Sequence, residues 1–329
     1  MKKALQALLL ILAPLLATEL GFRLYAHQFE NCSSHLKDAE LKNLNQTFVH
    51  HPHPGIQFHF CRGLKARLLG SEITSNSEGF RGADWSIKKD RPLIVGLGDS
   101  VLMGWGVADQ KDFLHQAVNG INSKNKLDLQ VMNLSMAGYA ANHLYHLFRE
   151  KIVKLKPTLV VMTYVGNDWE SENAKNRQKR FSSISYALNY FVLNFQKITG
   201  EIPSTEHLEW RTHQWPESMP EDLIEVYNAI SEMAEEHNIP IILVMDSRYE
   251  SPLARHEAIE GLAKDLSFKV LNLFKEMRTL DFVPPTVAVT IPDDHNQNYL
   301  IPDDGHPNLA WHEEVARRLT PIILEVLNP

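Results

Sequence analysis

The sequence has few cysteines, no excess of positive charge and no internal repeat, and each absence narrows the class of protein. Lysine and arginine together number 33 against 40 aspartates and glutamates, which gives a formal net charge of -7. No basic stripe with interleaved aromatic residues is present, so nucleic acid is not an expected partner. The absence of repeats and of low-complexity tracts excludes solenoids and disordered arrays. With 329 residues, 44% of them hydrophobic, the chain can bury a substantial globular core.

Long hydrophobic runs are also scarce, and the longest one lies at the N-terminus. It covers residues 4–17 and follows Lys2 and Lys3. A spanning helix needs about 20 residues, a length that the run reaches only if it continues to Tyr25. No small-x-small cleavage site follows, so residues 1–27 favour an uncleaved signal anchor, with a cleaved signal peptide or a buried core helix as alternatives.

The charge before this segment predicts where the rest of the chain lies. Positive residues stay on the cytoplasmic side of a membrane, so we expect a membrane-anchored periplasmic protein, or a secreted one if the segment is cleaved. The two cysteines, Cys32 and Cys61, both follow the segment. An exported compartment would allow them to form a disulfide, and two inert thiols are the alternative.

Residues 28–90 are predicted to be an irregular lead-in. This stretch is rich in polar turns and contains His51, His53, His59 and Cys61. Imidazole and thiolate are the usual zinc ligands, but their spacing here matches no closed tetrahedral site. We therefore expect ordinary loop histidines and no bound metal.

Beyond residue 91, short apolar runs alternate with segments of helical period. The expected strands are residues 93–97, 129–134, 159–165, 239–245 and 268–273, and the expected helices include 142–155, 222–238, 252–266 and 308–327. Near-continuous apolar strands that alternate with helices indicate a parallel sheet covered on both faces. We therefore predict an α/β domain over residues 91–329, with its active site at the carboxyl ends of the strands.

Three successive strand ends carry residues suited to acyl chemistry. The first delivers Ser100 in a Gly-Asp-Ser turn, as a candidate nucleophile. The second leads to Gly138, whose missing side chain lets a backbone N–H approach an oxygen. The third leads to Asn167, whose amide is a side-chain donor. Each of them alone is as readily a turn residue, and their joint occurrence is what indicates a nucleophile with oxyanion donors.

The base is expected late in the chain, just before the last predicted helix. His306 follows Asp303 by three residues, so the carboxylate can accept one ring N–H while the other nitrogen faces Ser100. A helix-capping role is available for Asn308 and also for Asp304. His295 is the alternative base.

These residues occur in the order of the four blocks of the SGNH, or GDSL, hydrolases, and residues 76–328 resemble that family. The resemblance implies a flavodoxin-like three-layer α/β/α sandwich with a central parallel sheet, Ser100 as nucleophile, His306 as base and Asp303 as its partner. It also implies an oxyanion hole made by the backbone N–H groups of Ser100 and Gly138 and the side chain of Asn167. No metal or organic cofactor is required by this chemistry. Residues around the Gly-Asp-Ser turn resemble a bacterial membrane-anchored branch of the family.

The resemblance implies an ester hydrolase that acts on acyl or acetyl esters of an envelope glycan or lipid. An O-acyltransferase with the same residues and a catalytically silent glycan-binding protein are the alternatives. One departure is that Gly166 directly precedes Asn167, whereas the family block has one residue between its glycine and its asparagine. We expect substrate preference to lie in an insertion at residues 170–220, which is too long for a plain connection. Apolar residues at helical spacing over 181–198 fit either a packed helix or a lid that admits acyl chains.

Overall fold

The computed structural model describes most of the predicted catalytic domain. The described residues are 13–21, 31–41, 44–51, 53, 55–165, 168, 218–246, 253–277, 299–301 and 304–327. Asn167, His295 and Asp303 lie outside these ranges, and so does almost all of the predicted insertion at 170–220.

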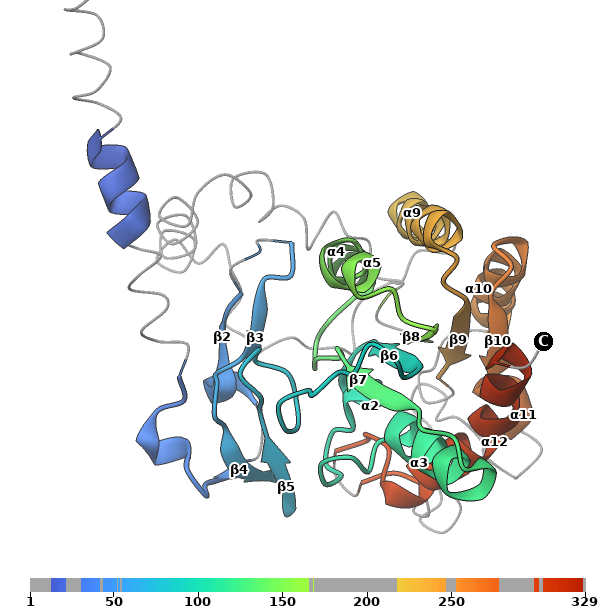
Figure 1. The fold of residues 1–329 in the computed structure, drawn as a ribbon, viewed down its shortest axis with the longest axis horizontal. Helices are drawn as coiled ribbons and strands as arrows, with labels where there is room; N and C mark the ends of the chain where they lie inside the picture. Colours follow the sequence, from blue (N-terminus) through green and yellow to red (C-terminus); the bar gives the residue numbers. More distant parts are fainter. Residues whose placement is uncertain are drawn as a thin grey trace, which may run out of the picture.

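A five-stranded sheet forms the centre of the molecule (Figure 1). Its strands are β6 (Leu93–Leu97), β7 (Gln130–Asn133), β8 (Leu159–Tyr164), β9 (Ile241–Met245) and β10 (Lys269–Asn272). The order is β10-β9-β8-β6-β7, and every neighbouring pair is parallel. Counted from β6 this is the doubly wound order 2-1-3-4-5. All residues of β6, β8 and β9 are buried, as expected for strands covered on both faces.

Helices cover both faces of this sheet, which confirms the predicted three-layer α/β/α sandwich. One face carries α4 (Ala141–Leu147), α9 (Glu221–His237) and α10 (Leu253–Asp265), and the other carries α3 (Phe113–Asn125) and α12 (Leu309–Leu327) (Figure 1). Side chains of β6 alternate between the two cores, with Val95 facing the first layer and Ile94 the second. This alternation follows from the period-two geometry of a strand.

Local sequence sets the helix ends. The Asp112 carboxylate caps α3 by accepting the N–H groups of Leu114 and His115. Helix α9 ends at Asn238, which has the left-handed conformation that asparagine tolerates. The remaining helical pieces are α2 (Ser100–Met103), a π-helical turn (Phe148–Ile152) that joins α4 to α5 (Val153–Leu155), and α11 (Leu273–Met277).

The lead-in is more regular than the sequence suggested. Strands β1 (Glu40–Leu41), β4 (Lys65–Leu68) and β5 (Ser71–Thr74) form one small sheet, and β2 (Phe48–His50) pairs with β3 (Phe58–Phe60) in a second. Two 3-10 turns, Ser34–Leu36 and Asn45–Thr47, complete it. In strands of two to four residues an alternating pattern covers too few positions to stand out, even in β4 where it is present, which explains why they escaped prediction. Cys32 and Cys61 form a disulfide that closes this region.

The N-terminal segment is described only over residues 13–21, which are helical. Its leucines Leu15, Leu16 and Leu20 are 62%, 67% and 58% exposed. Among the described residues no helix is both long and apolar enough to cross a membrane. Most of the predicted anchor at 1–27 lies outside the described residues, and the anchor stays a prediction.

Candidate active site

Ser100 stands at the carboxyl end of β6, where the strand turns sharply into α2. Asp99 caps this short helix, because its carboxylate accepts the Val101 N–H at 3.0 Å. Gly98 is needed for the close approach of β8, since a β-carbon there would lie 2.1 Å from the Thr163 hydroxyl. Ser100 is the first residue of α2, so its own N–H has no partner within the helix. The turn therefore presents a hydroxyl and a backbone donor at the same strand end.

His306 meets this hydroxyl from the far end of the chain. Its Nε2 lies 3.0 Å from the Ser100 Oγ. The loop that carries it folds back on itself: the Ile301 N–H donates to the His306 carbonyl at 2.8 Å, and Leu300 bridges to Pro307. The structure thus brings the predicted nucleophile and the predicted base together.

The carboxylate that contacts the imidazole is Asp304. Its Oδ1 lies 2.6 Å from the His306 Nδ1 and also accepts the His306 backbone N–H at 3.2 Å. Gly305, with φ at 82°, makes this tight turn possible. Of the two residues suggested as helix caps, Asn308 makes the cap, because its side chain accepts the Trp311 N–H at 3.1 Å. Asp303, predicted from its spacing to His306, lies outside the described residues.

The negative charge of Asp304 determines which ring nitrogen of His306 carries the proton. Burial raises the pKa of this carboxyl, but hydrogen bonds from His306 and Trp105 and the charge of His306 outweigh it, and the net pKa is lowered. An ionised Asp304 accepts a hydrogen bond from the Nδ1–H of His306, which leaves the Nε2 lone pair to face Ser100. The Ser100 Oγ is also 3.2 Å from the Asp99 Oδ2. A hydroxyl has one proton to donate, so these two acceptors compete for it.

Gly138 lies in the loop between β7 and α4, at the same end of the sheet. This loop contacts the turn at residues 98–100 through the Met136 N–H, which donates to the Gly98 carbonyl at 3.1 Å. Gly138 itself is exposed and has φ at 84°. The neighbouring Tyr139 is buried and donates its hydroxyl to the Phe58 carbonyl at 2.7 Å, so the lead-in hairpin β2–β3 supports the turn.

Asn167, the third predicted donor, is not among the described residues, but its neighbour Asp168 is. The buried Asp168 carboxylate accepts the Ala141 N–H at 3.0 Å and the Val165 N–H at 3.1 Å. It therefore joins the end of β8 to the first turn of α4, the helix that follows Gly138. Sequence reasoning gave Asp168 no role, although its position directly after Asn167 was a usable signal.

Trp105 is a second residue that sequence reasoning did not single out. Its ring stacks on the His306 imidazole, with 4.6 Å between ring centroids and 16° between planes. Its Nε1–H donates to the Asp304 Oδ2 at 3.2 Å. An aromatic residue between two glycines just after a candidate nucleophile was the only sequence signal.

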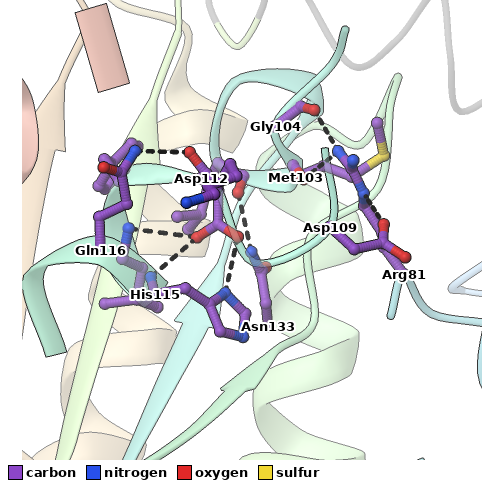
Figure 2. Close-up of polar contacts among 12 residues, drawn as sticks. Arg81, Met103, Gly104, Asp109, Asp112, His115, Gln116 and Asn133 are labelled. Atoms are coloured by element: carbon purple, nitrogen blue, oxygen red, sulfur yellow. Dashed lines mark hydrogen bonds and ion pairs between the residues drawn. The ribbon is translucent and has the colours of Figure 1, made fainter. Parts of the chain in front are cut away.

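The buried Arg81 side chain binds backbone carbonyls at the end of α2 and just after it (Figure 2). Arg81 donates to the carbonyls of Met103 at 3.1 Å, and also to those of Gly104 and Val107. Its Nε pairs with the Asp109 carboxylate at 2.7 Å. The Arg81 side chain therefore satisfies several carbonyls of the turn between α2 and α3.

A second polar pair, Asp112 and His115, lies beside the Arg81 side chain. The His115 Nδ1 is 2.6 Å from the buried Asp112 carboxylate. Figure 2 shows the two side chains facing one another. Burial lowers the pKa of His115, but the charge of Asp112 and the hydrogen bond to it together outweigh burial, and the net pKa is raised. The pair lines a cavity of about 250 Å³, to which neither Ser100 nor His306 contributes.

The histidines of the lead-in pack against one another. His51 and His59 have ring centroids 5.1 Å apart, and His53 lies 5.2 Å from His146 of α4. Burial and the positive charges of neighbouring groups lower the pKa of His51 to about 3. Within the described ranges no group of His, Cys, Asp or Glu is arranged to hold a metal ion.

Comparisons with known proteins find only distant similarity. No protein-family model matches the chain, and no curated protein matches it. Among solved structures, it is similar to TesA, with a TM-score of 0.44 and 13% identity over 71% of this chain and 99% of that one. It is similar to the psychrotrophic esterase EstA from Pseudoalteromonas sp., with a TM-score of 0.44 and 13% identity over 72% and 99% of the two chains. The acetyl xylan esterase AlAXEase gives 0.44 and 14% identity, over 70% and 99%.

Proposed function

We propose that the chain is a serine ester hydrolase of the SGNH/GDSL type. The observation that carries this proposal is the unbroken contact from Ser100 through His306 to Asp304, at 3.0 Å and 2.6 Å. The three groups stand at the carboxyl end of a parallel sheet, where α/β proteins place their chemistry. A hydroxyl, an imidazole and an ionised carboxylate in this sequence of contacts are the parts of a nucleophilic triad.

The first half of the reaction follows from this geometry. Ser100 Oγ attacks the ester carbonyl while His306 Nε2 takes its proton, and Asp304 stabilises the imidazolium that results. The developing oxyanion is met by the backbone N–H groups of Ser100 and Gly138 and by the Asn167 amide. His306 then returns the proton to the leaving alcohol, which leaves an acyl group on Ser100.

In the second half, His306 takes a proton from water, and the hydroxide attacks the acyl-enzyme. Collapse of the intermediate releases the acid and restores the Ser100 hydroxyl, with its proton returned by His306. A sugar hydroxyl in place of water would give the O-acyltransferase alternative with the same residues. The identity of the acceptor therefore decides between the two activities.

Turnover of a short-chain aryl ester by the purified full chain tests the proposal. Ser100→Ala and His306→Ala should each lower kcat by about a thousandfold or more, because each removes a reacting group. Ser123→Ala is the matched control, since that exposed hydroxyl bonds within α3, to the Asn119 carbonyl. Turnover that does not depend on Ser100 would contradict the proposal, and absence of turnover in wild type would favour a silent glycan-binding protein.

We further propose an envelope location and an ester-bearing glycan or lipid as substrate. The basic and apolar N-terminal segment supports export, and the Cys32–Cys61 disulfide fits an oxidising compartment. Comparing acetyl with long-chain acyl esters would separate glycan deacetylation from lipid hydrolysis. Protease digestion of intact spheroplasts should remove the catalytic domain, and its protection would contradict the periplasmic location.

A further inference from the structure

The turn after α2 holds Trp105 between two glycines with left-handed backbone. Gly104 has φ at 83° and Gly106 at 70°. A β-carbon at Gly106 would lie 2.2 Å from the Ile301 side chain, so the turn passes close to the loop that carries His306. The Trp105 N–H donates to the Ser100 carbonyl at 3.0 Å. Its backbone is therefore tied directly to the candidate nucleophile.

The Trp105 side chain reaches the other two members of the triad. Its indole lies nearly parallel to the His306 imidazole, with centroids 4.6 Å apart and 16° between planes. Its Nε1–H donates to the Asp304 Oδ2 at 3.2 Å, while the Oδ1 of the same carboxylate faces His306 Nδ1. One residue thus contacts all three triad members, each through a different part of itself.

The two side-chain contacts of Trp105 have opposite effects on the stability of the charged, imidazolium form of His306. A cation stacked on the face of an indole is stabilised by the ring quadrupole, so the stack favours imidazolium. The Nε1–H donated to Asp304 disperses part of the carboxylate charge, which weakens its pull on the same imidazolium. Trp105 therefore holds the imidazole parallel to its own ring. The basicity of His306 then depends on the balance between the stack and the hydrogen bond to Asp304.

We propose that Trp105 is a positioning residue that tunes the proton affinity of His306 and fixes the Asp304 carboxylate. This role rests on the proposed function of the site. Simple packing is the competing explanation, because Trp105 is also partly buried against the core. Packing predicts loss of stability without any ordered change in the titration of His306.

Titration of His306 by NMR in the full chain, labelled at its histidines, separates the two explanations. The resonance that disappears in His306→Gln belongs to His306. Two Trp105 variants then separate the effect of the aromatic face from that of the Nε1–H. Trp105→Phe keeps an aromatic face but loses the N–H, so the pKa of His306 should rise above that of wild type. Trp105→Leu loses both, and its His306 pKa should fall about half a unit below that of the Phe variant.

Steady-state kinetics on an aryl ester give a second readout. In Trp105→Leu, kcat should fall about tenfold with KM little changed, and Trp105→Phe should recover most of that loss. Trp85→Leu is the control: this partly buried indole packs on Phe80, 5.6 Å between centroids, and should leave the His306 titration unchanged.

The outcomes are separable. Identical His306 pKa values in the Phe and Leu variants, within about 0.2 unit, would overturn the positioning role even if both variants lost stability. Absence of Ser100-dependent turnover in wild type would overturn the proposed function. The His306 titration would still decide the role of Trp105 in that case, because it requires no substrate.

Discussion

Asp303 and Asp304 are adjacent carboxylates that both stand within reach of His306 in the sequence. The contact at 2.6 Å between Asp304 and the His306 Nδ1 is the basis on which we propose Asp304 for the orienting role. A neutral imidazole with a free Nε2 carries its only N–H on Nδ1, and Asp304 already accepts it. The ring therefore has no second N–H to donate to another carboxylate.

This assignment predicts unequal effects of two matched substitutions. Asp304→Asn should lower kcat/KM by about 10²- to 10⁴-fold, since the amide no longer stabilises imidazolium and can favour the wrong tautomer. Asp303→Asn should change it by less than about threefold. Kinetics on a short-chain aryl ester provide the measurement, and the reverse order would return the role to Asp303.

At this scale, sequence reasoning identified Ser100 and His306 because each follows a recognisable pattern, a strand end and a loop before a helix. It chose Asp303 from its spacing to His306, whereas the contact that the structure describes is made by Asp304, in a turn built on Gly305. Trp105 and Asp168 were missed for a similar reason. Their roles depend on hydrogen bonds to residues that are remote in the sequence, Asp304 and Ala141.

Among the elements, the buried strands were the most predictable. β6, β8 and β9 are wholly buried, so their apolar runs stand out from the flanking helices. The strands of the lead-in do not stand out in this way, because each has only two to four residues. Their role beside the site, where the Phe58 carbonyl accepts the Tyr139 hydroxyl, was invisible from local pattern.

Two glycines, one inside α3 and one just after β6, predict opposite effects of the same substitution. Gly120 lies inside α3, and a β-carbon added there would meet nothing within 4 Å, so Gly120→Ala should stabilise the fold by about 0.5–1 kcal/mol. Gly98→Ala would force a β-carbon against Thr163 and should lower both stability and turnover. Urea unfolding followed by circular dichroism measures the stabilities, and a stable, fully active Gly98→Ala would contradict the close packing of β6 on β8.

For the whole molecule, the disulfide-closed lead-in and the α/β domain meet along the histidine-rich face of α4. His51 is central there: burial, His59 and Lys151 together bring its pKa to about 3. Because the folded state depresses this pKa below its ordinary value of 6.5, the unfolded chain binds more protons between the two values. Stability from a neutral His51 is therefore present above about pH 6.5 and is lost as the pH falls towards 3.

His51→Asn should flatten this acid dependence. Asparagine keeps an acceptor for the His53 N–H, which now donates to the His51 Nδ1 at 2.9 Å, but it does not titrate. The unfolding free energy of the variant should decline less than that of wild type between about pH 6.5 and 4.5. His35→Asn, at an exposed position, is the control and should follow wild type. Parallel decline in all three proteins would contradict the depressed pKa.

The proposed activity depends on Ser100 being made a nucleophile by His306 and Asp304. Treatment of the full chain with a fluorophosphonate, followed by peptide mass spectrometry, probes this directly, because such probes form a phosphonyl bond only with an activated hydroxyl. We expect one adduct, on Ser100, that disappears in Ser100→Ala, is strongly reduced in His306→Ala and persists in Ser123→Ala. No adduct on Ser100 in the folded wild-type protein, or labelling that is indifferent to His306, would contradict the triad.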